Sequence, residues 1–137
     1  MNIAYPPKVI LAWAEAINGN KALRDWLIAN GYPELGLFVY ALHLKRDARE
    51  WLMANGFSHL MALINGAEGN KNALLWLRKH EFDVLEKMAL AADNSDDALL
   101  WLMSQDLKDM AIVAQRMREV KNDIERRNSD IHFMSWD

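Results

Sequence analysis

The sequence of 137 residues contains no cysteine and has only 3 prolines and 6 glycines. Without cysteine the chain forms no disulfide, offers no thiolate for catalysis and builds no zinc site from sulfur ligands. A cysteine-free chain fits a reducing compartment. The scarcity of proline and glycine leaves a composition that favours helices.

The chain also lacks an excess of positive charge and any long hydrophobic run. Its 16 basic and 19 acidic side chains give a net charge of -3, so no overall positive field attracts nucleic acid or an anionic membrane. The N-terminal apolar run from Val9 to Ala14 is too short for a signal-peptide core or a membrane span. We therefore expect a cytoplasmic protein with no membrane partner, and nucleic acid is not favoured as a partner.

A Trp-Leu pair that returns every 25 residues dominates what is present. The pairs are Trp26-Leu27, Trp51-Leu52, Trp76-Leu77 and Trp101-Leu102. A fixed period of this length in a helix-forming chain is typical of stacked helical repeats. Each repeat unit holds two short helices, and the first of them carries the Trp-Leu pair.

The second helix of each unit carries apolar residues at i, i+3, i+4 and i+7, which form one stripe of an amphipathic helix. This pattern occurs five times in register. The five sets are Ile10, Trp13, Ala14, Ile17; Leu35, Phe38, Val39, Leu42; Leu60, Leu63, Ile64, Ala67; Leu85, Met88, Ala89, Ala92; and Met110, Val113, Ala114, Met117.

Capping residues fall at the same repeat positions. Asn20, Asn70 and Ser95 precede the first helices, where a side-chain oxygen accepts from an unpaired amide of the first turn. Lys45 breaks this series, and we expect Asp47 and Glu50 to form a capping box slightly later.

The turns inside the units show a second series. Asn30-Gly31 and Asn55-Gly56 provide the left-handed residue that ends a helix. The glycine is absent from His80-Glu81 and Gln105-Asp106, so we expect these two turns to differ or to be strained.

Together these patterns predict an all-α fold, an α-α superhelix (solenoid) of about four and a half 25-residue helical hairpins. Short connections make consecutive helices antiparallel neighbours, arranged as an arc of two helix layers. Residues 1-127 form a single helical-repeat domain and residues 128-137 a C-terminal tail. The expected helices span 7-18, 21-30, 33-44, 47-55, 58-67, 71-80, 83-93, 96-105 and 107-127.

The repeated (A)xxWLxxNGxxxL unit resembles the α-solenoid families, nearest to leucine-rich-repeat-variant and short HEAT-like repeats. The segment AREWLMANG at residues 48-56 also resembles the second helix of an ankyrin repeat, but ankyrin units are longer, at about 33 residues. The resemblance covers residues 7 to about 120. It implies an α-α superhelix that binds a partner, and it transfers no catalytic residue to this chain.

Several patterns invite a chemical interpretation, and each has a simpler structural one. The four repeated tryptophans could be a stacking ladder, but we interpret them as core or inter-repeat packing because no basic residues interleave with them. Asp93 to Asp97 imitates the start of a calcium loop without its glycine and glutamate, so we expect a turn and an N-cap. The histidines have no ligand spacing; they are His43, His59, His80 and His132.

The last helix carries basic residues interspersed with acids, and a salt-bridged face is the favoured interpretation. The expected pairs are Lys121 with Glu125 and Asp123 with Arg127. The other basic residues of this helix are Arg116, Arg118 and Arg126.

We therefore expect no enzyme, no catalytic residue, no cofactor and no metal. The leading hypothesis is a non-enzymatic scaffold for an unknown protein partner, which would bind an exposed face or the tail residues Phe133, Met134 and Trp136. The alternatives are a self-associating structural protein that forms a homo-oligomer, and a nucleic-acid binder using the last helix. For self-association, an apolar patch would come from Met53, Met61 and Met103.

Overall fold

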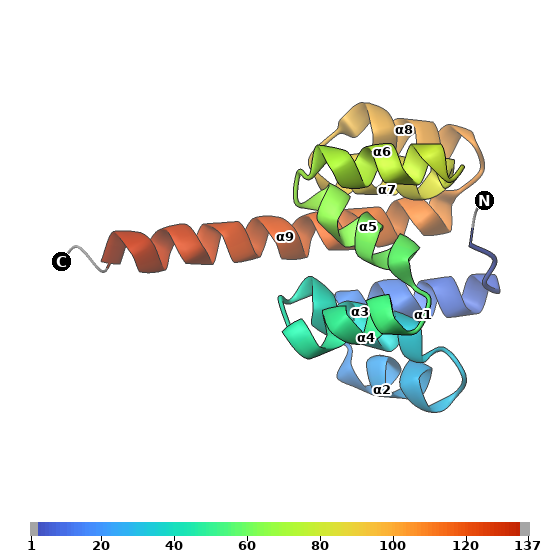
Figure 1. The fold of residues 1–137 in the computed structure, drawn as a ribbon, viewed down its shortest axis with the longest axis horizontal. Coiled ribbons are helices and arrows are strands. Elements are labelled where there is room, and N and C mark those ends of the chain that lie inside the picture. Colours follow the sequence, from blue (N-terminus) through green and yellow to red (C-terminus); the bar gives the residue numbers. More distant parts are fainter. Residues whose placement is uncertain (1–2, 135–137) are drawn as a thin grey trace.

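A computed structural model describes the backbone of residues 3–134 and the side chains of residues 3–128. This part of the chain is all-α, with nine helices and no strand (Figure 1). The helices are α1 (Pro7–Ile17), α2 (Lys21–Ala29), α3 (Pro33–Leu42), α4 (Arg46–Ala54), α5 (Ser58–Ala67), α6 (Lys71–Lys79), α7 (Asp83–Ala92), α8 (Asp96–Ser104) and α9 (Lys108–Met134).

The predicted apolar stripes form the core. All five sets of four residues in the second helices are buried, and so are the leucines of the four Trp-Leu pairs. Trp13 and Phe38 are the largest of these fully buried side chains, and their rings meet edge to face at 5.0 Å. Side chains three and four residues apart share one side of a helix, which is why the stripe identifies the buried face.

The predicted caps are confirmed at three of the four first helices. Asn20, Asn70 and Ser95 accept the amides of Leu23, Ala73 and Ala98 at 3.0 to 3.2 Å. The capping box predicted for the remaining helix is wrong. There α4 begins at Arg46 with Lys45 at the cap position and no side-chain cap, because the turn keeps the 25-residue register despite the change of residue.

Left-handed residues recur with the same period. They lie at positions 19, 44, 69 and 94 between units, and at 31, 56, 81 and 106 within units. The two turns without glycine therefore keep the same backbone geometry as the other turns. Of the two expectations for them, a different turn or a strained one, strain is confirmed: Glu81 has φ 62° and Asp106 has φ 60°. A left-handed backbone costs about 1 to 2 kcal/mol for a residue with a Cβ.

The arc of helices closes on itself. The odd-numbered helices form an inner layer in which each packs against the next, and α9 packs against both α7 and α1. The even-numbered outer helices contact their neighbouring inner helices but, within the described residues, not one another. Figure 1 shows α9 crossing the middle of the molecule, between the α6 to α8 group and the α1 to α4 group. The fold is thus solenoid-like, with the last helix set against the first.

The last helix is longer than predicted. It runs through position 128, where a break was expected, and ends at Met134, and Figure 1 shows its C-terminal part projecting beyond the other helices. Positions 128 to 134 contain no proline or glycine, so polarity alone did not mark an end. No helix in the described part of the chain combines the length and the apolar character that crossing a membrane requires.

Candidate protein-binding surface

An open groove lies on the outer side of the molecule, between α4 and α6 and over α5. We call it the middle groove. It has a volume of about 330 Å³. A second hollow along α4 adjoins it and shares Met53 and Met61. The lining residues of the middle groove are Met53 from α4; Ser58, Met61, Ala62 and Asn65 from α5; and Asn70, Asn72, Ala73 and Trp76 at α6.

One end of the middle groove is formed by two residues, one on the outer and one on the inner helix of a hairpin. The residue types at these two positions differ from hairpin to hairpin. Positions 28, 53, 78 and 103 of the outer helices correspond to one another, as do positions 36, 61, 86 and 111 of the inner helices. In the first hairpin, Gly36 lets α2 sit directly on α3: a Cβ at Gly36 would lie 2.4 Å from Ile28 Cγ1 and 2.9 Å from the Arg24 carbonyl oxygen. In the second hairpin the same two positions hold methionines, one buried and one exposed.

The third and fourth hairpins use other solutions at these positions. Arg78 forms an ion pair with the buried carboxylate of Glu86 at 2.8 Å. The fourth hairpin has Met103 opposite Ala111. The second hairpin is therefore the one in which two flexible apolar side chains occupy both positions.

Small residues keep the middle groove open. Ala62 and Asn65 line it from α5, whereas the equivalent residues are Leu37 and Tyr40 in the preceding unit and Lys87 and Leu90 in the next. These larger side chains are engaged locally: Arg24 lies 4.5 Å above the Tyr40 ring, and Lys87 lies 5.5 Å from the Trp101 ring. The groove is thus open because Ala62 and Asn65 are smaller than the equivalent residues of the neighbouring units, while the arrangement of the helices is the same.

The polar lining of the middle groove is neutral and rich in amides. Asn70 uses its Oδ1 to cap α6, which leaves its NH₂ group for other partners. Within the described part of the chain, no hydrogen bond engages the side chains of Ser58, Asn65 or Asn72. The neighbouring units place acids, Asp47 and Asp97, where this groove has Asn72.

The repeated tryptophans lie at the periphery instead of the core. Trp26 is 45% exposed, and the other three are partly buried. Trp51 stacks on Phe57, and Trp76 stacks on Phe82, each on the aromatic residue that follows the turn of its own unit. The expected packing role is confirmed for Trp51, Trp76 and Trp101, which are partly buried against the core, whereas Trp26 is exposed.

Exposed apolar side chains also mark the last two outer helices. Leu75 is 58% exposed and Leu100 is 62% exposed, at a repeat position that holds Asp25 and Glu50 in the first two units. Of the three methionines predicted to form one patch, Met53 and Met61 meet in the middle groove. Met103, 48% exposed, lies on α8 and does not line that groove.

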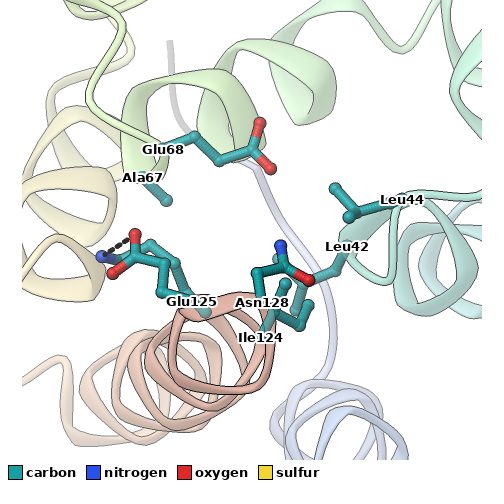
Figure 2. A pocket seen from close by; sticks show the side chains of 8 residues that line it. Leu42, Leu44, Ala67, Glu68, Ile124, Glu125 and Asn128 are labelled. Atoms are coloured by element: carbon teal, nitrogen blue, oxygen red, sulfur yellow. Dashed lines mark hydrogen bonds and ion pairs between the residues drawn. The ribbon is translucent and has the colours of Figure 1, made fainter. Parts of the chain in front are cut away.

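A smaller cavity of about 210 Å³ lies where the C-terminal ends of α3 and α5 meet α9. Figure 2 shows Leu42 and Leu44 on one side of it, Glu68 opposite, and Ile124 and Asn128 of α9 below. Its charges are already paired: Glu68 with Arg49 at 3.0 Å, and the buried Lys121 with Asp93 and Glu125 at 3.2 and 3.3 Å. The charged groups at this cavity therefore hold helices together and offer little net charge to a ligand.

The arginines and the lysine of α9 from position 116 to 127 are likewise paired. Both predicted pairs are confirmed, Lys121 with Glu125 at 3.3 Å and Arg127 with Asp123 at 3.1 Å. Arg118 bridges Asp96 at 2.9 Å and also donates to the Ala91 carbonyl at the end of α7. Neutralised cations of this kind release few counterions on contact with a phosphate backbone, so this helix does not form a strongly basic face.

Polar groups at the opposite end of the inner helices serve to tie elements together. The Tyr5 hydroxyl donates to the buried Glu34 carboxylate at 2.8 Å, and burial together with this bond raises the pKa of Tyr5. His59 stacks on Phe82 at 5.1 Å, and its pKa is lowered by burial, against a smaller opposing effect of Glu34. Within the described residues, no three His, Asp or Glu side chains come close enough together to hold a metal ion.

The tail residues predicted to bind a partner lie at or beyond the limit of the described residues. Phe133 and Met134 belong to the last turns of α9, where side chains are not described, and Trp136 lies outside the described residues. Sequence reasoning missed Ala62, Asn65 and Asn72. The signal was available as a departure from the equivalent positions of the other units, in the second hairpin at Ala62 and Asn65 and in the third at Asn72.

Comparison of the chain with models of protein families, with curated proteins and with solved structures finds no match.

Proposed function

We propose that this protein is a non-enzymatic scaffold that binds another protein through its outer helices, with the middle groove as the central contact. The observation that carries the proposal is the exposure of Met53, 56% accessible, on the wall of an open apolar groove floored by Met61 and Ala62. Exposed apolar surface next to a groove is characteristic of a protein contact. Stacked hairpins present such surfaces without a lid or a buried reaction centre.

The chain offers a matched pair of variants to test this proposal. Met53 and Met103 occupy the same repeat position and are similarly exposed, at 56% and 48%, but only Met53 lines the groove. The wild-type protein, Met53→Glu and Met103→Glu would each be immobilised and used to retain proteins from the cells that make this chain. A partner retained by the wild type and Met103→Glu, and lost with Met53→Glu, is the expected result. Equal retention by all three proteins would contradict a groove-centred contact.

Self-association is a second candidate, favoured by Leu75 and Leu100. Two strongly exposed leucines at equivalent positions of consecutive outer helices are suited to an apolar contact between copies. Multi-angle light scattering at several concentrations would show a dimer for the wild type and a monomer for the Leu75→Glu, Leu100→Asp variant. The fold accepts acids there, because the first two units carry Asp25 and Glu50. A wild-type monomer at all concentrations would remove this candidate.

A further inference from the structure

We infer that the middle groove binds an extended, uncharged peptide segment of the partner, holding its backbone with asparagine side chains and its apolar side chains against Met53 and Met61. This inference rests on the proposed scaffold function and specifies what the scaffold binds. It follows from three features of the groove: its apolar floor, its neutral polar groups and its contrast with the equivalent positions of the neighbouring units.

The polar groups of the groove match a peptide backbone. An amide side chain carries two donors and an acceptor, the same kinds of group that a peptide bond presents. Asn65 and Asn72 have no hydrogen-bond partner among the described residues, and Asn70 commits only its oxygen. Unpaired amides at the edge of an apolar groove gain most from a partner that brings both donors and acceptors, since a polar group desolvated without a partner is costly.

An extended segment satisfies this requirement and a helix does not. A helix pairs its backbone groups internally except at its ends, so its sides offer no backbone donor or acceptor to the asparagines. An extended chain exposes N–H and C=O groups along both edges and directs alternate side chains toward and away from the groove. The floor residues Met61 and Ala62 can then receive the inward-facing side chains, with Met53 adapting to their shape.

The absence of charge in the groove points to an uncharged segment. Its lining contains no acid or base, and it has Asn72 where the neighbouring units have Asp47 and Asp97. Arg49 and Glu50 appear only in the adjoining hollow, where Arg49 is engaged with the Ala41 carbonyl and Glu68. A charged side chain placed in the middle groove would lose hydration without gaining an opposite charge.

The test uses randomised dodecapeptides, displayed on phage and selected against the full chain. Selected sequences would be synthesised with a fluorophore and measured by fluorescence anisotropy. We expect neutral sequences with apolar residues two positions apart. Methylating the nitrogen of one central backbone amide should weaken binding about tenfold, because it removes one donor and obstructs the approach of the asparagines.

Variants that copy the residues of the neighbouring units locate the binding site. Ala62→Leu with Asn65→Tyr introduces the residues found at Leu37 and Tyr40 and should weaken binding by about tenfold or more by filling the groove. Asn72→Asp introduces the neighbours' acid at an exposed position, removes the NH₂ donors and should weaken binding about threefold to tenfold. Met103→Glu should leave the affinity unchanged. Circular dichroism would verify that each variant is folded. If the groove-filling variant does not fold, the affinity of Asn72→Asp decides whether the peptide binds in the middle groove.

Each alternative outcome is distinguishable. If no peptide is selected, or if the selected peptides bind the groove-filled and Asn72→Asp variants as well as the wild type, the inference is wrong. Peptides that become helical on binding, or that tolerate N-methylation, would also overturn it. The scaffold proposal would survive any of these results if a protein partner still depended on Met53, and it would fail separately if none did.

Discussion

Replacing Gly36 with alanine tests whether the direct contact between α2 and α3 is as tight as the structure shows. A Cβ at this position would lie 2.4 Å from Ile28 Cγ1 and 2.9 Å from the backbone oxygen of Arg24. The isoleucine side chain can move, but the carbonyl moves only if α2 shifts away from α3. Gly36→Ala should therefore separate the two helices or strain their contact.

The expected size follows from two opposing effects. Overpacking a close contact costs about 1 to 3 kcal/mol, while replacing glycine with alanine inside a helix returns about 1 kcal/mol. We expect a net loss of about 0 to 2 kcal/mol in the free energy of unfolding. Urea unfolding followed by far-ultraviolet circular dichroism measures this as a lower midpoint with an unchanged slope.

Two further variants identify the cause of the loss. Ile28→Ala removes the nearest side-chain atoms but leaves the Arg24 carbonyl, so alanine at Gly36 should cost less in that background, with a coupling of about 1 kcal/mol. Gly66→Ala is the matched control in α5, because the nearest atoms are at 3.0 Å and belong to side chains; its loss should be smaller. If Gly36→Ala instead stabilises the protein, as helix propensity alone predicts, the described contact between α2 and α3 is refuted.

Three further predictions concern burial, backbone strain and pH. Trp13→Ala should lower the free energy of unfolding by about 3 to 5 kcal/mol because Trp13 is fully buried, whereas Trp26→Ala at a 45% exposed position should cost much less. Comparable losses for the two variants in urea titrations would contradict the burial of Trp13 and the exposure of Trp26. Asp106→Gly should raise the free energy of unfolding by about 0.5 to 1 kcal/mol by relieving a left-handed backbone, and Asp106→Ala, which keeps the Cβ, should give no such gain in thermal melts. Burial lowers the pKa of His59 in the folded state, so the unfolded chain binds more protons as the pH falls through the ordinary histidine range, and stability should decrease there. His59→Gln should reduce that decrease between neutral and mildly acidic pH, and an NMR titration placing the His59 midpoint at or above the ordinary value would rule the explanation out.

The periodic features of this fold could be predicted from the sequence because each depends on neighbouring residues. A stripe at i, i+3, i+4 and i+7 is a local property of one helix, and the predicted stripes are buried in all five inner helices. The first residues of α1, α3, α5 and α7 were predicted as observed, at Pro7, Pro33, Ser58 and Asp83. Their residue types suit a helix start whatever the tertiary context.

The closure of the arc and the location of the groove could not be predicted in the same way. Curvature accumulates from small rotations between successive hairpins, so no local pattern states that α9 will reach α1. The tryptophans show the same limitation. A Trp-Leu pair indicates which face of an outer helix turns inward, but the extent of burial depends on how far apart the outer helices stand, and within the described residues these do not contact one another.

The architecture explains how an open groove can arise between two adjacent hairpins without a change in the backbone plan. One outer and one inner position are equivalent in all four hairpins, and four different pairs of residues occupy them: Ile28 with Gly36, Met53 with Met61, Arg78 with Glu86, and Met103 with Ala111. Because each unit packs mainly on its sequence neighbours, a change of residues at one contact alters the local groove and leaves the backbone plan intact. The two hairpins that line the middle groove can therefore carry alanine and asparagine where other units have bulky or charged residues, while the helices keep the same arrangement.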